Sequence, residues 1–190
     1  MPSRSDLHKY QERMINFIYT TPKCALWAGL GLGKTITTLS AITDLIDSMA
    51  VAKVLIVAPL RVANSVWHKE AVNWQHTKHL KFSIVTGSEK ERLAALHKTA
   101  DVYVINRENV TWIVEHYAKK WPFDMIVLDE ASSFKSSSSQ RFKSLRKTIP
   151  FTNRLVELTG TPSPNGLLDI WSQMYLLDCG ERLGRSMTAY

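Results

Sequence analysis

A short glycine-rich segment carries the clearest chemistry in this sequence. It consists of Ala28, Gly29, Leu30, Gly31, Leu32, Gly33, Lys34 and Thr35. It stands between an apolar run and a helical pattern, so its glycines allow a tight turn with inward-facing N–H groups while the helix dipole favours bound polyphosphate. Lys34 is expected to reach the β- and γ-phosphates, and the Thr35 hydroxyl to bind Mg²⁺. The segment therefore predicts a nucleotide-phosphate site.

Other interpretations of this segment fit less well. The strict phosphate-loop pattern has glycine at position 28, where this chain has Ala28. The dinucleotide-binding pattern G-x-G-x-x-G fits poorly, because its third glycine would stand one residue after Gly33. A glycine-rich turn followed by a chance lysine is the remaining alternative. The succession of strand, loop and helix argues against it.

An acidic pair stands at the end of another apolar run. Asp129 and Glu130 directly follow Met125–Leu128. Such a run places the two carboxylates at the carboxyl edge of a parallel sheet, where open α/β folds bind ligands. Asp129 is expected to hold Mg²⁺ through its water shell, and Glu130 to orient and deprotonate the water that attacks the γ-phosphate. The pair alone is a common pattern, but with the glycine-rich segment it predicts a hydrolytic site.

Apolar runs of strand length are expected to position these residues. They are Cys24–Trp27, Val54–Ala58, Phe82–Val85, Val102–Ile105, Met125–Leu128 and Leu155–Leu158. Most are continuously apolar, which is typical of strands buried on both faces of a parallel sheet. Helical patterns between and after them include Thr35–Ile46, Glu89–Leu96 and a stretch from Leu167 to Leu177. Strand and helix in alternation predict an α/β fold with a mostly parallel central sheet and helices on both faces.

The composition limits the class of protein: 190 residues include 24 Lys and Arg against 17 Asp and Glu, a net charge of +7, and 45% are hydrophobic. These values exclude a disordered or collagen-like chain, and the basic surplus is compatible with a polyanionic partner. No membrane-length apolar run or secretory signal is present, so a cytoplasmic protein is expected. Cys24, Cys179, His76 and His79 lack metal-ligand spacing. The serine-rich segment Ser132–Gln140 is expected to be a mobile surface loop.

With these elements in place, the sequence resembles the first RecA-like domain of superfamily 2 helicases, and within them the Swi/Snf-like DNA translocase branch. The resemblance extends over nearly the whole chain and follows the family's motif order. The motifs are Leu7-His8-Lys9-Tyr10-Gln11, Gly31-Leu32-Gly33-Lys34-Thr35, Val54–Ala58 with Pro59-Leu60, Trp67 with Glu70 and Trp74, Asp101–Asn106, and Leu158-Thr159-Gly160-Thr161-Pro162 with Asn165 and Trp171. It implies that residues 1–190 form a RecA-like P-loop NTPase domain that binds ATP and Mg²⁺.

The resemblance also implies roles for two further parts of the nucleotide machinery. Gln11 is expected to read the adenine edge of ATP, and a solvated helix glutamine is the plain alternative. A relay between ATP and DNA is expected from Thr159, Gly160 and Thr161. These threonines could instead simply close a strand.

Nucleic-acid contacts are expected at the ends of two strands, along the DNA backbone. The residues assigned to them are Arg61, Asn64, Asn106 and Arg107. An ordinary helix cap is the alternative for Asn64. A second basic group is expected to be a solvated face, and it comprises Arg141, Lys143, Arg146 and Lys147.

In this family a second RecA-like domain supplies arginines to the γ-phosphate and half of the DNA track. Nothing in this chain resembles that domain. Residues 1–190 are therefore expected to be the N-terminal half of a longer ATP hydrolase and nearly inactive alone, with DNA and the second domain as partners. Ala28-Gly29-Leu30 and Ser132 depart from the usual family residues. The compact spacing, together with the departure at residues 28–30, favours a small bacterial or phage member acting in the bacterial or infected-host cytoplasm.

Two functions from other classes remain open at the level of sequence. A P-loop nucleotide kinase would share the phosphate loop, although the motifs around Gln11 and Thr159 argue against it. A non-enzymatic nucleic-acid-binding module could keep a vestigial nucleotide site. The sequence argues against decay of the nucleotide site, because it keeps the intact set Lys34, Thr35, Asp129 and Glu130.

Overall fold

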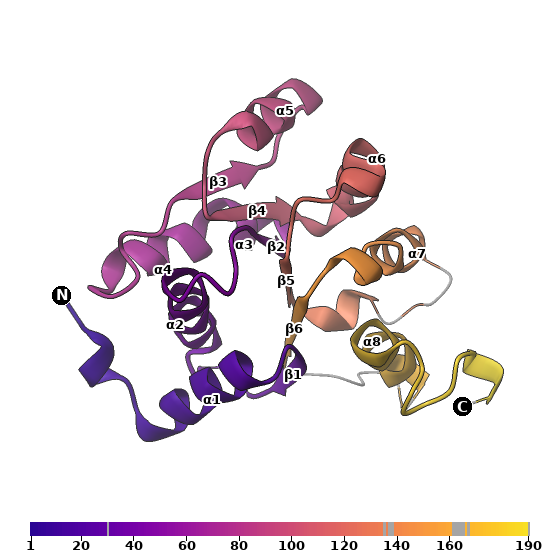
Figure 1. Ribbon diagram of the computed structural model, residues 1–190, viewed down its shortest axis with the longest axis horizontal. Coiled ribbons are helices and arrows are strands. Elements are labelled where there is room, and N and C mark those ends of the chain that lie inside the picture. Colours follow the sequence, from indigo (N-terminus) through magenta and orange to yellow (C-terminus); the bar gives the residue numbers. More distant parts are fainter. Residues whose placement is uncertain (30, 135, 137–138, 161–165, 167, 190) are drawn as a thin grey trace.

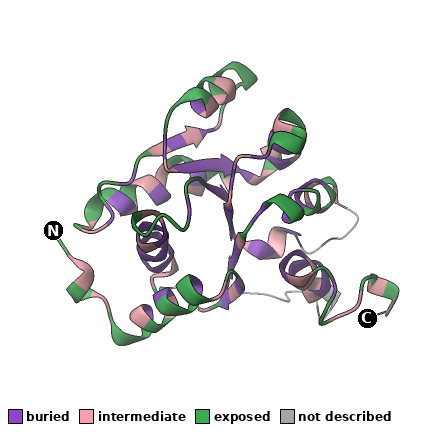
Figure 2. Ribbon diagram, viewed as in Figure 1, coloured by how far each residue is buried: buried purple, intermediate pink, exposed green. Residues whose placement is uncertain are grey.

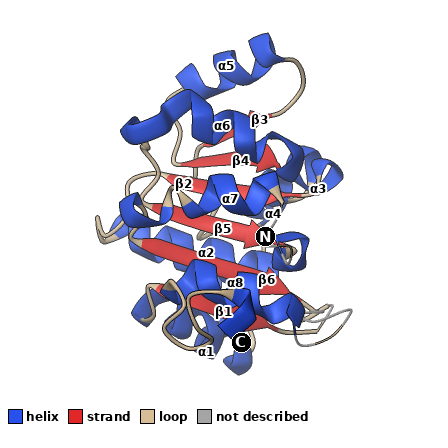
Figure 3. Ribbon diagram, turned by 90° about the vertical axis from the view of Figure 1, so that its right-hand side faces the viewer, coloured by secondary structure: helices blue, strands red, loops and turns tan. Residues whose placement is uncertain are grey.

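The computed structural model describes residues 1–29, 31–134, 136, 139–160, 166 and 168–189. Within them a six-stranded sheet has the order β1-β6-β5-β2-β4-β3 (Figure 3), and each described strand pairing is parallel. The strands are β1 (Lys23–Trp27), β2 (Val54–Ala58), β3 (Phe82–Val85), β4 (Val102–Asn106), β5 (Met125–Asp129) and β6 (Arg154–Thr159). Every apolar run that was expected to be a strand is one, so the predicted fold class is confirmed.

Helices cover both faces of the sheet (Figure 1). They are α1 (Lys9–Thr20), α2 (Lys34–Asp47), α3 (Leu60–Ser65), α4 (Trp67–Asn73), α5 (Glu89–His97), α6 (Val110–Tyr117), α7 (Gln140–Arg146) and α8 (Leu168–Asp178). One apolar cluster joins α1, α2 and α4 to one face, and a second joins α5, α6, α7 and α8 to the other. No helix in the described part of the chain has the length and apolar character needed to cross a membrane.

The central strands are buried along their whole length. Every residue of β2 and β4 is buried, and Figure 2 shows the middle of the sheet enclosed by the helices. This double coverage explains why their sequences are continuous apolar runs rather than alternating patterns. The helix α2 is itself largely buried, with Leu39, Ile42 and Leu45 fully covered. The phosphate loop is therefore fixed between two elements of the core.

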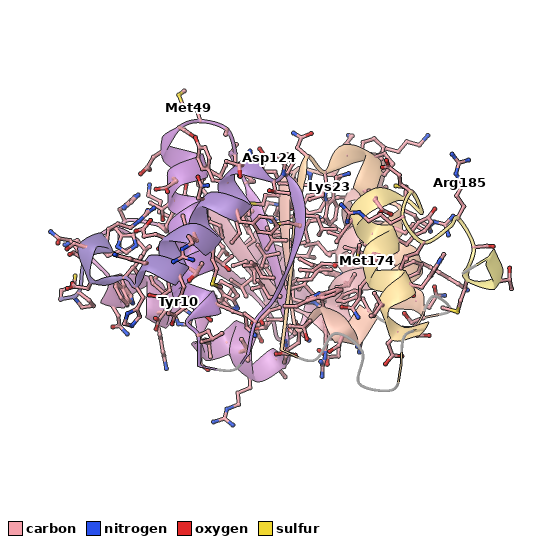
Figure 4. All side chains as sticks on the ribbon, turned by 90° about the horizontal axis from the view of Figure 1, so that it is seen from below. Tyr10, Lys23, Met49, Asp124, Met174 and Arg185 are labelled. Atoms are coloured by element: carbon pink, nitrogen blue, oxygen red, sulfur yellow. The ribbon has the colours of Figure 1, made fainter. Side chains whose placement is uncertain are left out.

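The parallel sheet gathers its functional loops at one edge. The segments that follow β1, β2, β4, β5 and β6 all leave at the carboxyl edge, because parallel strands share one direction. Figure 4 shows Lys23 and Asp124, which begin or precede strands, at the edge opposite to Tyr10 near the start of α1. The carboxylate of Asp124 accepts hydrogen bonds from the backbone N–H groups of Ala52 and Lys53, at 2.8 and 2.9 Å. The amino edge is thus tied together by bonds from the backbone to the Asp124 side chain, and the carboxyl edge carries the candidate chemistry.

The serine-rich segment differs from the surface loop that its composition predicts. Ala131–Phe134 forms a short 3₁₀ helix, and the Phe134 side chain is completely buried in the core. Ser139 begins α7, with its hydroxyl accepting a hydrogen bond from the backbone N–H of Phe142 at 3.2 Å. Residues 135, 137 and 138 lie outside the described residues. The prediction fails for the described start of the segment, because burial of one phenylalanine outweighs the polarity of its neighbours.

A carboxyl group is fully buried within the sheet. Glu157 on β6 is fully buried, and neither of its carboxyl oxygens has a hydrogen bond among the described residues. Burial, with a smaller contribution from Asp178, raises the pKa of Glu157 well above its ordinary value of 4.5. The group is therefore protonated in the folded protein at pH values where the unfolded chain has lost that proton.

This burial predicts a pH dependence of stability. Above pH 4.5 the unfolded state binds fewer protons than the folded state at Glu157, so the free energy of unfolding falls as pH rises, by at most about 1.4 kcal/mol per pH unit. Glu157→Gln should remove this contribution and make the protein more stable than the wild type at neutral pH. Denaturant unfolding between acidic and neutral pH measures it, with the exposed Glu115→Gln as a control. Equal slopes in Glu157→Gln and the wild type would contradict the assignment.

Candidate nucleotide site

The phosphate loop has the backbone that its glycines predict. Gly31 and Gly33 have φ values of 78° and 73°, in the left-handed region that favours glycine. Gly33 directly precedes α2 and has no side chain with which to cap it, so the N–H groups of the first turn face the loop. Lys34 Nζ donates a 2.6 Å hydrogen bond to the carbonyl oxygen of Ala28. The loop thus combines helix N–H groups with an ammonium group, as a polyphosphate site requires. Leu30, assigned to the same site, lies outside the described residues.

Gln11 lies against the phosphate loop and is held there at both ends of its amide. Its Nε2 donates to the carbonyl oxygen of Leu32 at 3.4 Å, and its Oε1 accepts from the backbone N–H of His8 at 2.8 Å. Only 7% of Gln11 is exposed, so the alternative of a solvated helix glutamine is wrong. Its expected contact with adenine stays a prediction.

Gly33 leaves no space for a side chain beside Gln11. A Cβ atom at Gly33 would lie 2.4 Å from Gln11 Nε2, whereas a Cβ atom at Gly31 would meet nothing within 4 Å. Both glycines have positive φ, so alanine at either position brings a similar backbone strain of about 1–2 kcal/mol. The pair therefore separates backbone strain from the contact with Gln11.

We expect Gly33→Ala to lower the free energy of unfolding more than Gly31→Ala does, because only Gly33→Ala must also displace Gln11. Denaturant unfolding without nucleotide measures the difference. Combining Gly33→Ala with Gln11→Ala should recover the excess loss, since the displaced amide is then absent. Identical losses at the two glycines would show that Gln11 does not pack as described.

The two acidic residues occupy different environments at the end of β5. Asp129 is its last residue, and its Oδ2 accepts a 3.0 Å hydrogen bond from the indole Nε1 of Trp67. Burial raises the pKa of Asp129, against the lowering effects of the Trp67 hydrogen bond and of Lys34. Glu130 follows with φ of +60°, a strained conformation for a residue other than glycine that costs about 1–3 kcal/mol. Asp129 and Glu130 both line the same pocket, but only Asp129 is held by the Trp67 indole.

Trp67 is a site residue whose role sequence reasoning missed. The sequence marked Trp67 only as part of a family motif, 62 residues before Asp129. In the structure Trp67 is completely buried at the start of α4, and its indole N–H donates to Asp129, the candidate metal ligand. A buried polar aromatic residue normally needs a partner for its N–H. The only available signal was the spacing of Trp67 and Glu70, which says nothing about which residue the indole reaches.

The phosphate loop and the acidic pair line one pocket of about 370 Å³. Its walls are Gly31, Leu32, Gly33, Lys34, Thr35, Ile36, Val62, Val66, Glu70, Asp129 and Glu130. Mg²⁺ prefers hard oxygen ligands and keeps several waters when it binds nucleotides. The Thr35 hydroxyl and the Asp129 carboxylate fit that preference, and no cluster of three or more His, Cys, Asp or Glu ligands occurs among the described residues. The pocket therefore offers oxygen ligands of the kind that a magnesium ion shared with nucleotide phosphates would take.

Trp67→Phe is expected to weaken the Mg²⁺-dependent part of ATP binding by about 10- to 100-fold, because partners that orient a metal ligand typically have effects of this size. It should also lower the free energy of unfolding by up to about 1–3 kcal/mol, since a partly buried carboxylate oxygen loses its donor. Mg²⁺ titrations of ATP affinity and denaturant unfolding measure the two effects. Trp112→Phe is the matched control, because it removes an indole bond of 3.3 Å to Glu89, which is not among the walls of this pocket. Equal effects in both variants would remove Trp67 from the site.

The residues assigned to nucleic-acid binding lie at the same edge of the sheet. Arg61 and Asn64 are exposed on α3, and Asn64 Oδ1 accepts a 2.7 Å hydrogen bond from the Thr86 hydroxyl. Arg107 is partly exposed directly after β4. Asn106 is buried, with its amide bonded to Glu108 at 3.0 Å and to Asn109 at 2.7 Å. We therefore assign Asn106 to shaping this turn rather than to a direct contact.

The residues of the expected relay are only partly described. Thr159 is the last residue of β6 and is buried beside β1 and β5, and Gly160 is exposed directly after it. Thr161 lies outside the described residues. The strand β6 stands between β1, which carries the phosphate loop, and β5, which carries Asp129. The relay role remains a prediction, although its first residue sits between the two halves of the nucleotide site.

A match to one protein family covers most of the chain. The SNF2-related domain family matches residues 10–182. This chain belongs to that family. The membership confirms the resemblance seen in the motifs and rules out the P-loop nucleotide kinase alternative.

Relatives of this SNF2-related chain include a phage protein and eukaryotic repair and remodelling proteins. Putative protein p41 of Acyrthosiphon pisum secondary endosymbiont phage 1 is 42% identical over 188 residues, covering 95% of this chain and 41% of that protein. The mouse DNA excision repair protein ERCC-6-like is 29% identical over 195 residues, covering 96% of this chain and 15% of that protein. The chain thus spans less than half the length of these relatives.

A solved structure shares the fold of this SNF2-related chain. The Sulfolobus solfataricus SWI2/SNF2 ATPase core in complex with dsDNA superposes with a TM-score of 0.80 at 24% sequence identity. The match covers 97% of this chain and 38% of that chain. The predicted RecA-like fold is confirmed by this match.

Proposed function

We propose that residues 1–190 are the first of two RecA-like domains in a motor that couples ATP hydrolysis to movement along DNA. The observation that carries this proposal is the convergence of Lys34, Thr35, Asp129 and Glu130 on one pocket at the carboxyl edge of the sheet. These residue types supply what phosphoryl transfer needs: a cation for the phosphates, oxygen ligands for a metal, and a carboxylate for the attacking water. The presence of the whole set also favours a working enzyme over a vestigial nucleotide site.

Each residue has a distinct part in the proposed reaction. The N–H groups that begin α2 and the Lys34 ammonium bind the phosphates, and Thr35 and Asp129 would hold Mg²⁺, which neutralises charge on the phosphates when bound. Trp67 keeps the Asp129 carboxylate in one orientation. Glu130 orients the attacking water and accepts its proton. Gln11 positions the adenine through its place beside the loop.

The short helix α3 supports a link between ATP and DNA. Val62 and the following Val66 line the nucleotide pocket, while Arg61 and Asn64 are exposed on the same helix. A shift of α3 when nucleotide binds would therefore move the candidate DNA contacts. The DNA-bound SWI2/SNF2 core with the same fold makes duplex DNA the natural partner to test. The phage relative favours the cytoplasm of a bacterium or infected host as the place of action.

DNA-stimulated ATP hydrolysis by the full-length protein tests the function, together with titration of labelled duplex at several salt concentrations. Arg61→Ala should reduce the slope of log affinity against log salt by about 0.9, the value for one lost phosphate contact on duplex DNA. Lys120→Ala is the matched control, because this exposed lysine precedes β5 at the opposite edge of the sheet. The proposed function would be contradicted if DNA did not stimulate ATP hydrolysis, or if both variants reduced the salt slope equally.

A further inference from the structure

A carboxylate at the carboxyl edge lies between two arginines from different parts of the chain. Glu108 Oε1 is 3.5 Å from Arg107 Nε and 4.0 Å from Arg141 Nη2. Both arginine side chains are 34% exposed and that of Glu108 is 49% exposed, so all three are accessible from solvent. The sequence assigned Arg107 to nucleic acid and Arg141 to a solvated face, 34 residues apart (141 − 107). The fold brings them to one carboxylate.

Packing of α7 against α6 places Arg141 beside Glu108. The Ser144 hydroxyl donates a 3.2 Å hydrogen bond to the Thr111 hydroxyl, which joins the two helices. Figure 1 shows α6 and α7 as neighbours on the same face of the sheet. Glu108 belongs to the short turn between β4 and α6, and Arg141 lies in the first turn of α7. Both therefore sit where the loops of the carboxyl edge meet.

Hydrogen bonds within the turn hold the Glu108 carboxylate in place. Asn106 Nδ2 donates to Glu108 Oε2 at 3.0 Å, and Asn109 Nδ2 donates to Asn106 Oδ1 at 2.7 Å. Partial burial acts to raise the pKa of Glu108, but hydrogen bonds from the backbone and Asn106, together with Arg107, lower it below its ordinary value. The carboxylate is thus ionised at neutral pH. An ionised oxygen pair between two guanidinium groups occupies the position that a phosphate would take.

We propose that Arg107 and Arg141 form a binding site for a DNA backbone phosphate, and that Glu108 occupies this site until the phosphate displaces it. The inference rests on the proposed function and adds Arg141 and Glu108 to the DNA-binding surface. Guanidinium groups suit phosphate because their planar N–H groups match its oxygens. Exposed ion pairs stabilise little, so the exchange of carboxylate for phosphate opposes DNA binding only weakly.

The test uses the full-length protein, a labelled duplex and salt titrations. Arg141→Ala should flatten the slope of log affinity against log salt by about 0.9. Between about 50 and 200 mM salt, the affinity of the variant should therefore fall by a factor about 3.5-fold smaller than that of the wild type. Lys143→Ala on the same helix, also exposed, should change it less. Glu108→Gln should raise affinity by about threefold or more at fixed salt without changing the slope, because a competitor is removed and no phosphate contact is added. Glu115→Gln, an exposed carboxylate on α6, is the matched control.

The double variant Glu108→Gln/Arg141→Ala decides between exchange and general repulsion. If the phosphate displaces Glu108, the gain in DNA affinity from Glu108→Gln should disappear when Arg141 is absent. A gain that persists in this background, or an effect of Arg141→Ala no larger than that of Lys143→Ala, overturns the inference. If Arg61→Ala weakens binding while these variants match their controls, only this inference fails; if no variant alters DNA binding, the proposed function fails too. Thermal unfolding of each variant confirms that it is folded, and Arg141→Lys, which keeps the charge, should retain part of the slope.

Discussion

Glu130→Gln in the full-length protein is expected to lower the rate of ATP hydrolysis by about 10²–10⁴-fold while ATP affinity stays nearly unchanged. A general base contributes a factor of this size, and it acts on the attacking water rather than on the bound phosphates. Glutamine keeps the shape of the side chain but cannot accept the proton. Its backbone must still adopt the φ of +60° found at Glu130, so the turn after β5 is under the same strain in both proteins. Steady-state hydrolysis and equilibrium ATP binding, measured on the same preparation, separate the two effects.

Lys34→Ala provides the contrast, because Lys34 lines the pocket and is placed to touch the phosphates in the ground state. It should weaken ATP binding itself. A Glu130→Gln protein that hydrolyses ATP at the wild-type rate would show that another group serves as the base. A Glu130→Gln protein that loses ATP affinity as strongly as Lys34→Ala would place the carboxylate in binding instead.

Residues 1–190 alone are expected to bind ATP·Mg²⁺ but to hydrolyse it about 10³–10⁵-fold more slowly than the longer protein. Among the described residues that line the pocket, Lys34 is the only lysine or arginine. Phosphoryl transfer of this kind gains a factor of about 10³–10⁵ from an added arginine, which we propose comes from a second RecA-like domain. Two apolar pocket residues, Leu32 and Val66, are each 38% exposed, which leaves this side of the site uncovered.

Thermal unfolding with and without nucleotide checks the binding half of this prediction, since ligand at about 100 times its dissociation constant adds about 2.7 kcal/mol of stability. Single-turnover and steady-state hydrolysis check the other half. Lys34→Ala in residues 1–190 is the control for contaminating ATPase activity. Rapid multiple turnover by residues 1–190 alone, at the rate of the longer protein, would mean that the pocket is already complete.

Local sequence determined the nucleotide site and the frame that holds it. Gly31 and Gly33 adopt positive φ values, as the predicted tight turn allows, and Lys34 begins the helix as expected. Each apolar run became a strand whose bounds lie within one residue of the predicted ones, because short continuous runs suit strands covered on both faces. Asp129 and Glu130 reached the phosphate loop because parallel strands deliver their following residues to one edge. Each of these features depends on neighbours in sequence or on a rule of strand direction.

Tertiary structure alone decided which side chains meet at that edge. Nothing in the sequence indicated that Trp67 bonds Asp129, that Arg141 lies beside Glu108, or that Phe134 fills the core from a serine-rich segment. The sequence favoured Asn106 as a DNA contact as much as Arg107, but the structure buries Asn106 in the turn after β4. These contacts join residues far apart in the chain, and their geometry follows from how helices pack on the sheet. A pattern of residue types carries the period of a helix or strand, but the partner of a given side chain is set by the packed interior.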